Sequence, residues 1–113
     1  MKIHRLVFRD IDKDKFDEVA NSVKTIETRA ATYKFLNIKP GDKLKIVCGN
    51  ESIEKLVTRV NHYPSIDNML DNLPLNKILP FAKNREDAFK IYYGFPGYKE
   101  KIEKHGIMAF KLK

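Results

Sequence analysis

The chain has 113 residues, a formal net charge of +7 and a hydrophobic fraction of 42%. This length fits one domain with its own core, and no stretch reaches the ~18 continuous apolar residues that a membrane-spanning helix needs. A single cysteine, Cys48, excludes an internal disulfide, and an N-terminus without a long apolar segment argues against a secretory signal.

The first half of the chain predicts strands, one helix and a tight turn. Apolar residues at helical spacing indicate a helix over 16–23, and residues 30–36 favour a brief helical turn. Pro40 followed by Gly41 is typical of a turn, because proline restrains one backbone torsion and glycine supplies a positive φ at the next residue. Alternation of apolar and polar residues predicts strands over 2–8, 43–48 and 52–63.

The second half predicts helices followed by a closing strand. Ser65 is a predicted cap for a helix over 66–73, and Asn84, with Asp87 three residues later, is a predicted cap for a helix that extends to Phe95. A short connection, a solvated helix face and a strand are predicted over 75–79, 99–104 and 107–113. This order lacks the regular alternation of a doubly wound sheet and predicts an α+β fold, a partly closed mixed barrel with helices at its rim.

Residues 24–29, K-T-I-E-T-R, place a Lys, a Glu and an Arg in a β-branched run directly after the first predicted helix. The run favours a strand, on which Thr25, Glu27 and Arg29 share one face while Lys24 stands at the junction with the helix. Three charges in so short a strand indicate either a solvated edge or the lining of a cleft. A structural network of ion pairs between strand and helix is a further interpretation.

The run at 24–29 and several later segments resemble, in order, the ASCH domain family over residues 2–113. The resemblance implies a single domain over 1–113, a PUA-like mixed β pseudo-barrel with short helices at the rim, and a cleft lined by the charged run. The segments that carry it are K-P-G-D at 39–42, N-H-Y-P-S-I-D-N-M-L at 61–70, I-L-P at 78–80, R-E-D-A-F-K-I-Y-Y-G-F at 85–95 and H-G-I-M-A-F-K-L at 105–112.

The leading functional hypothesis is binding of RNA or a modified nucleoside in that cleft. Lys24 and Arg29 can hold a phosphate, and Glu27 can accept a hydrogen bond from the exocyclic amine of a base. His62, at the end of the long strand, and Tyr93, beside the inward face of its helix, are candidates for the cleft rim. The basic excess, which is spread over both halves of the chain, agrees with a polyanionic partner, although it also serves solubility.

The alternative is a small metal-independent hydrolase, a ribonuclease or an enzyme similar to N4-acetylcytidine amidohydrolases. For that branch of the family the resemblance implies catalytic roles for Lys24 and Glu86. Glu86 matches the glutamate that the branch carries on a later helix. The threonine that the branch uses as its nucleophile is Glu27 here, which leaves Thr25 as the nearest substitute. No ligand spacing for a metal and no phosphate-binding glycine loop is present, so no cofactor is expected. An adaptor domain without a small ligand is a third option, and a cytoplasmic location is expected for all three.

Overall fold

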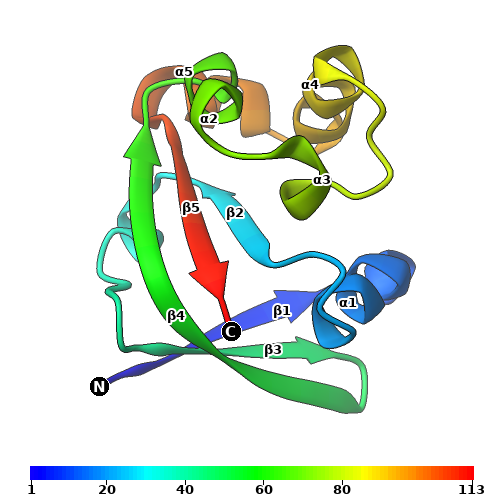
Figure 1. Cartoon of the computed structure of the whole chain (residues 1–113), viewed down its shortest axis with the longest axis vertical. Helices are drawn as coiled ribbons and strands as arrows, with labels where there is room; N and C mark the ends of the chain where they lie inside the picture. Colours follow the sequence, from blue (N-terminus) through cyan, green and yellow to red (C-terminus); the bar gives the residue numbers. More distant parts are fainter.

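The computed structural model describes all 113 residues, and its centre is one five-stranded sheet. Strand β1 pairs in parallel with β3, and the other neighbouring strands are antiparallel (Figure 1). The order across the sheet leaves β1 and β2 as its two edges. In that order the strands are β1 (Ile3–Phe8), β3 (Lys43–Cys48), β4 (Glu51–Tyr63), β5 (Ile107–Leu112) and β2 (Ile26–Ala30).

The long strand β4 curls this sheet into a half-barrel. Its first half pairs with β3, and from Val57 onward it pairs with β5. The register shifts between Val57 and Arg59, where an irregularity interrupts the ladder. Because such a bulge increases the local twist and bends its strand, β4 can serve two neighbours that run in different directions.

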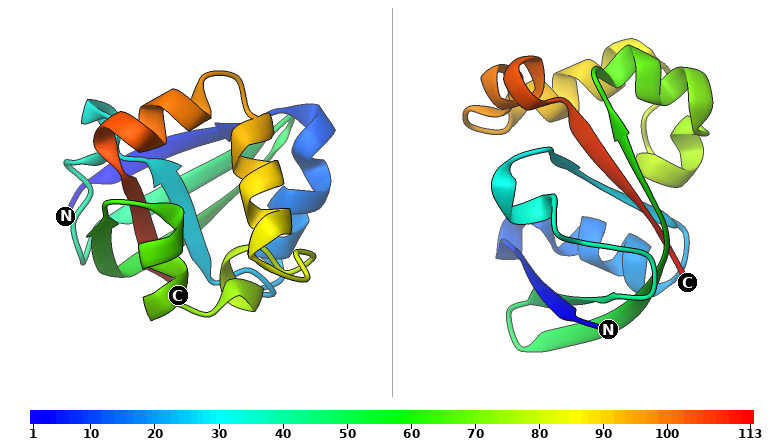
Figure 2. Two further views of the ribbon diagram at one scale, coloured as in Figure 1. Left: turned by 90° about the horizontal axis from the view of Figure 1, so that it is seen from above. Right: turned by 90° about the vertical axis from the view of Figure 1, so that its left-hand side faces the viewer.

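Short helices complete the barrel at its rim. Helices α2 to α5, in the connection from β4 to β5, gather at one end of the sheet, whereas α1 lies beside the end of β1 (Figures 1 and 2). No helix combines the length and apolar character that crossing a membrane requires. The helices are α1 (Lys13–Ala20), α2 (Ile66–Asn72), α3 (Leu75–Ile78), α4 (Arg85–Gly94) and α5 (Tyr98–His105), with 3-10 turns η1 (Asp10–Asp12) and η2 (Tyr33–Phe35).

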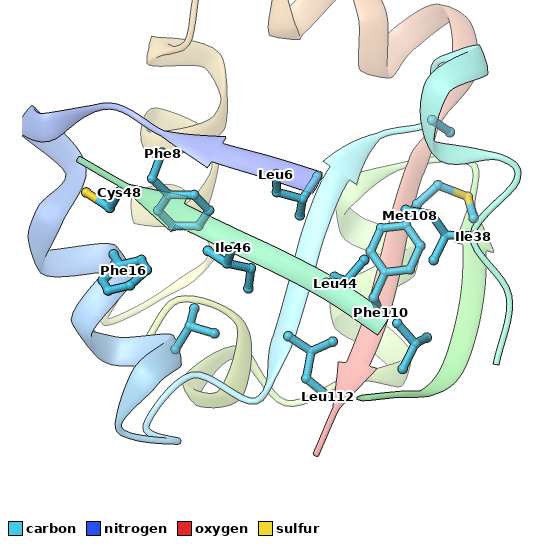
Figure 3. Close-up of a cluster of buried hydrophobic side chains, with 13 residues drawn as sticks. Leu6, Phe8, Phe16, Ile38, Leu44, Ile46, Cys48, Met108, Phe110 and Leu112 are labelled. Atoms are coloured by element: carbon cyan, nitrogen blue, oxygen red, sulfur yellow. The ribbon is translucent and has the colours of Figure 1, made fainter. Parts of the chain in front are cut away.

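Two apolar cores lie on the two faces of the curved sheet. The first packs α1 against the strands and contains Phe16, Leu44 and Phe110 (Figure 3). The second packs the rim helices against β2 and β5 and contains Met69 and Tyr92. Strand β5 contributes alternate residues to both cores, so almost its whole length is buried. The two cores therefore meet across β5.

The predicted α+β pseudo-barrel with rim helices is confirmed, and most boundaries agree with the sequence patterns. Ser65 caps α2 by accepting a hydrogen bond from the Asn68 N–H, and Asn84 caps α4 by accepting one from the Asp87 N–H. Two predictions were wrong in detail. Residues 75–78, predicted as part of a short connection over 75–79, form the helix α3, and α1 ends at Ala20 instead of residue 23.

The early end of α1 determines where the charged run, residues 24–29, lies in the fold. Ser22 adopts a left-handed conformation with φ of 58°, and the carbonyl of Glu18 accepts hydrogen bonds from the N–H groups of both Val23 and Lys24. This compact turn reverses the chain immediately before Lys24. It is the local feature that brings Lys24 and β2 to one side of the fold.

Candidate functional site

A pocket of about 400 Å³ opens beside the two edge strands of the sheet. Its lining comes from the end of β1 and the following turn, from Lys24 and β2, and from α4 and α5. Phe8 belongs to the first apolar core, whereas Leu79 and Tyr92 belong to the second. We call this the β1–β2 pocket. It lies where the two cores meet, so rigid packed elements support its walls.

Glu27 is the most buried charged residue of the protein, with 1% of its surface exposed. Its Oε1 atom lies 2.6 Å from Arg29 Nη1 and 3.3 Å from Lys24 Nζ, and it accepts a 2.9 Å hydrogen bond from the Thr28 N–H. Its other oxygen, Oε2, has no hydrogen-bond partner although it is buried. Because unpaired buried polar atoms are costly, a donor group that reached this oxygen would stabilise it.

The charges around Glu27 keep it ionised. Burial acts to raise the pKa of Glu27, but the charges of Lys24 and Arg29, together with the Thr28 N–H, outweigh it and hold the pKa below its ordinary value. Burial likewise acts to lower the pKa of Arg29, and the carboxylate of Glu27 overcomes it, so the pKa of Arg29 is raised. The cluster of Lys24, Glu27 and Arg29 therefore places one carboxylate and two cations in a poorly hydrated setting.

Aromatic rings and one hydroxyl pair form the rest of the wall. The guanidinium carbon of Arg29 lies 5.3 Å from the centre of the Phe8 ring, which restrains the arginine from the β1 side. Thr28 and Tyr92 share a hydrogen bond between their hydroxyl groups. Burial raises the pKa of Tyr92, so its hydroxyl stays protonated near neutral pH. On the opposite side, the Tyr98 and Phe95 rings meet edge to face at 5.3 Å.

The mouth of the pocket carries two further cations, and both are neutralised by one acid. Arg9 Nε lies 2.8 Å from a carboxylate oxygen of Asp12, and Lys15 Nζ lies 3.4 Å from its other oxygen. Each cation that lines the pocket is thus within ion-pair distance of either Asp12 or Glu27. The pocket is polar and charged, but its charges are largely compensated.

A second buried carboxylate, Glu18 on α1, lies behind this cluster. Only 9% of Glu18 is exposed, and its Oε2 atom also lacks a partner. Burial raises the pKa of Glu18; Lys24 acts against this, whereas the charges of Asp14 and Glu27 act with it. The folded protein therefore disfavours the ionised form of Glu18 relative to the unfolded chain.

We expect Glu18→Gln to stabilise the protein at neutral pH by ~1 kcal/mol. A raised pKa in the folded state contributes stability that is complete below the ordinary pKa and is lost as pH rises through the folded value. The neutral glutamine does not suffer that loss, so its advantage should vanish below about pH 4. Urea unfolding at several pH values measures this, and Glu103→Gln, at an exposed site, controls for net charge. A gain that is independent of pH would contradict the explanation.

The structure brings together Lys24, Glu27 and Arg29, as the charged run predicted, but it excludes Thr25 from the pocket. Strand β2 begins at Ile26, and the backbone of Thr25 bonds instead to the Lys77 carbonyl and the Leu112 N–H. Three consecutive residues, 27 to 29, line the pocket in place of an alternating set. The period-two argument fails here because the pocket lies at a sheet edge, where both faces of a strand can be reached.

Three other predicted site residues lie elsewhere. Glu86 is 76% exposed on the solvent side of α4, 3.5 Å from Lys90, because this helix turns Ile91 and Tyr92 toward the pocket instead. His62 bonds to the His105 carbonyl in a separate surface hollow at the start of β5. Tyr93 packs against Phe89 and does not line the pocket. The expectation that Glu86, His62 and Tyr93 reach the cleft is therefore corrected.

Sequence reasoning also missed several residues that line the pocket. Phe8 was predicted only as the end of a strand, and Arg9, Tyr92 and Tyr98 were given no role in the site. The one signal that could have found part of this lining is the helical spacing of Ile91, Tyr92 and Phe95, which places them on one side of the helix, and all three line the pocket. No group of three or more His, Cys, Asp or Glu side chains is arranged to hold a metal ion.

Fold and pocket together define a small α+β pseudo-barrel protein with a charged, aromatic-walled pocket. The structure is similar to the crystal structure of the hypothetical protein PH0355, with a TM-score of 0.82 and 26% identity over all of this chain and 98% of that one. It is also similar to the solution structure of protein PF0455 from Pyrococcus furiosus, with a TM-score of 0.77 and 26% identity over all of this chain and 96% of that one. No protein-family model and no curated protein matches the sequence.

Proposed function

We propose that this protein is an ASCH domain, PUA-like in fold, that binds RNA or a modified nucleoside with a base in the β1–β2 pocket. The observation that carries the proposal is the unpartnered Oε2 atom of Glu27, a buried acceptor on a residue that lines a pocket of ligand size. A base N–H or amino group supplies the donor that this oxygen lacks. Carboxylates pair in this way with the amino group of cytosine.

The surroundings of Glu27 suit the rest of a base. Because Oε1 is already shared by three donors, Oε2 is the oxygen of Glu27 that still lacks a donor. The remaining N–H groups of Lys24 and Arg29 can donate to ring nitrogens and carbonyl oxygens beside the amino group. Tyr98 and Phe95 supply flat rings against which a base can stack. The free buried thiol of Cys48 agrees with a cytoplasmic location.

The second candidate function, hydrolysis of RNA or an acylated nucleoside, has one observation in its favour. Lys24 Nζ lies 3.3 Å from Glu27 inside the pocket, which gives one cation and one carboxylate for acid–base chemistry. The set first considered loses Glu86, which is exposed outside the pocket. A hydrolase would therefore depend on Lys24 and Glu27, without a helix acid.

Lys24→Ala separates these functions. We expect the wild-type protein to retain single-stranded RNA without turnover and the variant to bind about tenfold more weakly, because Glu27 loses one of its charged partners and the ligand loses a donor. Titration with RNA decamers and the four nucleosides, and chromatography of N4-acetylcytidine incubations, measure both. Lys83→Ala, an exposed lysine without an ion pair, is the control.

Each other outcome has a definite meaning. Product that forms with the wild type and disappears in Lys24→Ala supports the hydrolase and contradicts a binding-only domain. If the wild type engages neither RNA nor nucleosides, and Lys24→Ala only lowers the melting temperature, the cluster is a structural ion-pair network and the proposal fails.

A further inference from the structure

A second hollow, of about 480 Å³, lies along the same edge strand. It is lined by Ile3 to Val7 of β1 and by Lys34 and Phe35 of η2, and we call it the Arg5 hollow. Val7 lines both this hollow and the β1–β2 pocket. Since β1 pairs only with β3, no other strand covers this side of it. The two concavities therefore lie next to each other along one uncovered strand.

The two concavities differ in the charge of their lining. In the β1–β2 pocket each cation has an acidic partner, as described above. Arg5 and Lys34 form no ion pair, and no acidic residue lines the Arg5 hollow. His4, the remaining polar residue there, is already bonded to Asp42. Of the two concavities, only the Arg5 hollow carries uncompensated positive charge, and there a phosphate would gain more than in the β1–β2 pocket.

The Arg5 hollow also offers apolar surface beside its charges. Phe35 is half-buried and lies under the Lys34 ammonium, which is 5.4 Å from the ring centre. Ile3 and Val7 are 55% and 65% exposed, although both belong to a strand. A ring, exposed aliphatic side chains and two free cations match the base and phosphate of one nucleotide.

We propose that the ligand is a single strand of RNA rather than a free nucleoside, and that its neighbouring nucleotide lies in the Arg5 hollow. This inference rests on the proposed function of the β1–β2 pocket. From Arg5 to Phe8 the strand advances about 10 Å, which an extended polynucleotide can follow without leaving the surface. One base enters the β1–β2 pocket, and the adjoining phosphate lies against Arg5 and Lys34. A peptide strand added to the edge of β1 would gain nothing from these two cations unless it were acidic.

The double variant Arg5→Ala/Lys34→Ala tests this. We expect its affinity for the nucleosides to equal that of the wild type, because neither residue lines the β1–β2 pocket. Affinity for single-stranded RNA decamers should fall about tenfold in low salt. The slope of log affinity against log salt, measured over ~50–200 mM, should become shallower by about 0.7, since each neutralised phosphate of a single strand contributes about 0.7.

The control is Arg59→Ala/Lys111→Ala, which removes two exposed cations that face each other across β4 and β5, outside both concavities. If this control weakens RNA binding as much as Arg5→Ala/Lys34→Ala, net charge alone is responsible, and the proposed nucleotide site in the Arg5 hollow is wrong. If nucleosides bind, RNA binds no more tightly than they do, and neither variant changes RNA affinity, the nucleotide site in the Arg5 hollow is again wrong. The proposed function of the β1–β2 pocket then stands. If the wild type binds neither ligand, both proposals fail.

Discussion

Glu27→Gln is expected to lower the free energy of unfolding by about 3–5 kcal/mol. The substitution keeps the shape of the side chain but removes the charge that compensates Lys24 and Arg29. Lys24 is 6% exposed and the Arg29 side chain 19%, so water cannot replace the lost partner. A loss of this size is a large part of the stability of a small domain. Chemical denaturation with far-UV circular dichroism measures it directly.

The pH dependence of this effect has a definite sign. A pKa that is lowered in the folded state contributes stability that is present above the ordinary pKa and is lost as pH falls through the folded value. The pKa of Glu27 is lowered, so the wild type should lose this contribution only below about pH 4. The free energy of unfolding of Glu27→Gln should not show this additional decrease at acidic pH. A variant that keeps the wild-type acid dependence would contradict the assignment to Glu27.

The double variant Lys24→Met/Glu27→Gln is the control for this prediction. Removing both charges leaves no uncompensated lysine, so we expect the double variant to be more stable than Glu27→Gln alone. It also provides a folded protein for ligand titration if the single variant does not fold. If the two substitutions are additive, Lys24 and Glu27 do not interact in the folded protein, and the pocket electrostatics described above are wrong.

The local parts of this fold could be predicted from sequence because their causes are local. The strand Lys43–Cys48 follows from a turn at Pro40 and Gly41, and both helix caps depend on a side chain three residues from its partner. The end of α1 could not be predicted, since it depends on Ser22 adopting a left-handed conformation that serine rarely takes. Val23 continues the apolar spacing of the helix, so the sequence pattern does not show that the helix ends at Ala20.

The pocket could be predicted only as far as its residues are neighbours in the chain. Lys24, Glu27 and Arg29 lie within one short run, and their charges were visible. Tyr98, on the opposite wall, reaches the pocket only because the whole rim packs onto the sheet. Glu86 was chosen by resemblance, and the choice failed because Glu86 lies on the solvent side of α4, away from the face that carries Ile91 and Tyr92. The cleft and the ion-pair network also proved not to exclude each other, since one cluster forms both.

Tyr98→Ala is expected to weaken RNA binding by about 1–3 kcal/mol, or roughly 5- to 150-fold. Tyr98 lines the pocket, and its ring meets Phe95 at 5.3 Å, so its removal takes away one face against which a base would stack. Tyr98→Phe keeps that face and should bind nearly as tightly as the wild type. Fluorescence anisotropy with labelled RNA decamers measures all three proteins.

Tyr93→Ala is the matched control, because Tyr93 and Tyr98 agree in residue type, in burial and in the lysine over the ring, but only Tyr98 lines the pocket. Both rings are half-buried, and each lies under a lysine, Lys99 for Tyr93 and Lys101 for Tyr98. Tyr93 was the residue that sequence favoured, yet it packs against Phe89 outside the pocket. We therefore expect Tyr93→Ala to lose stability but not RNA affinity. If Tyr93→Ala weakens binding and Tyr98→Ala does not, the ligand lies on the outer face of α4, and the β1–β2 pocket is not its site.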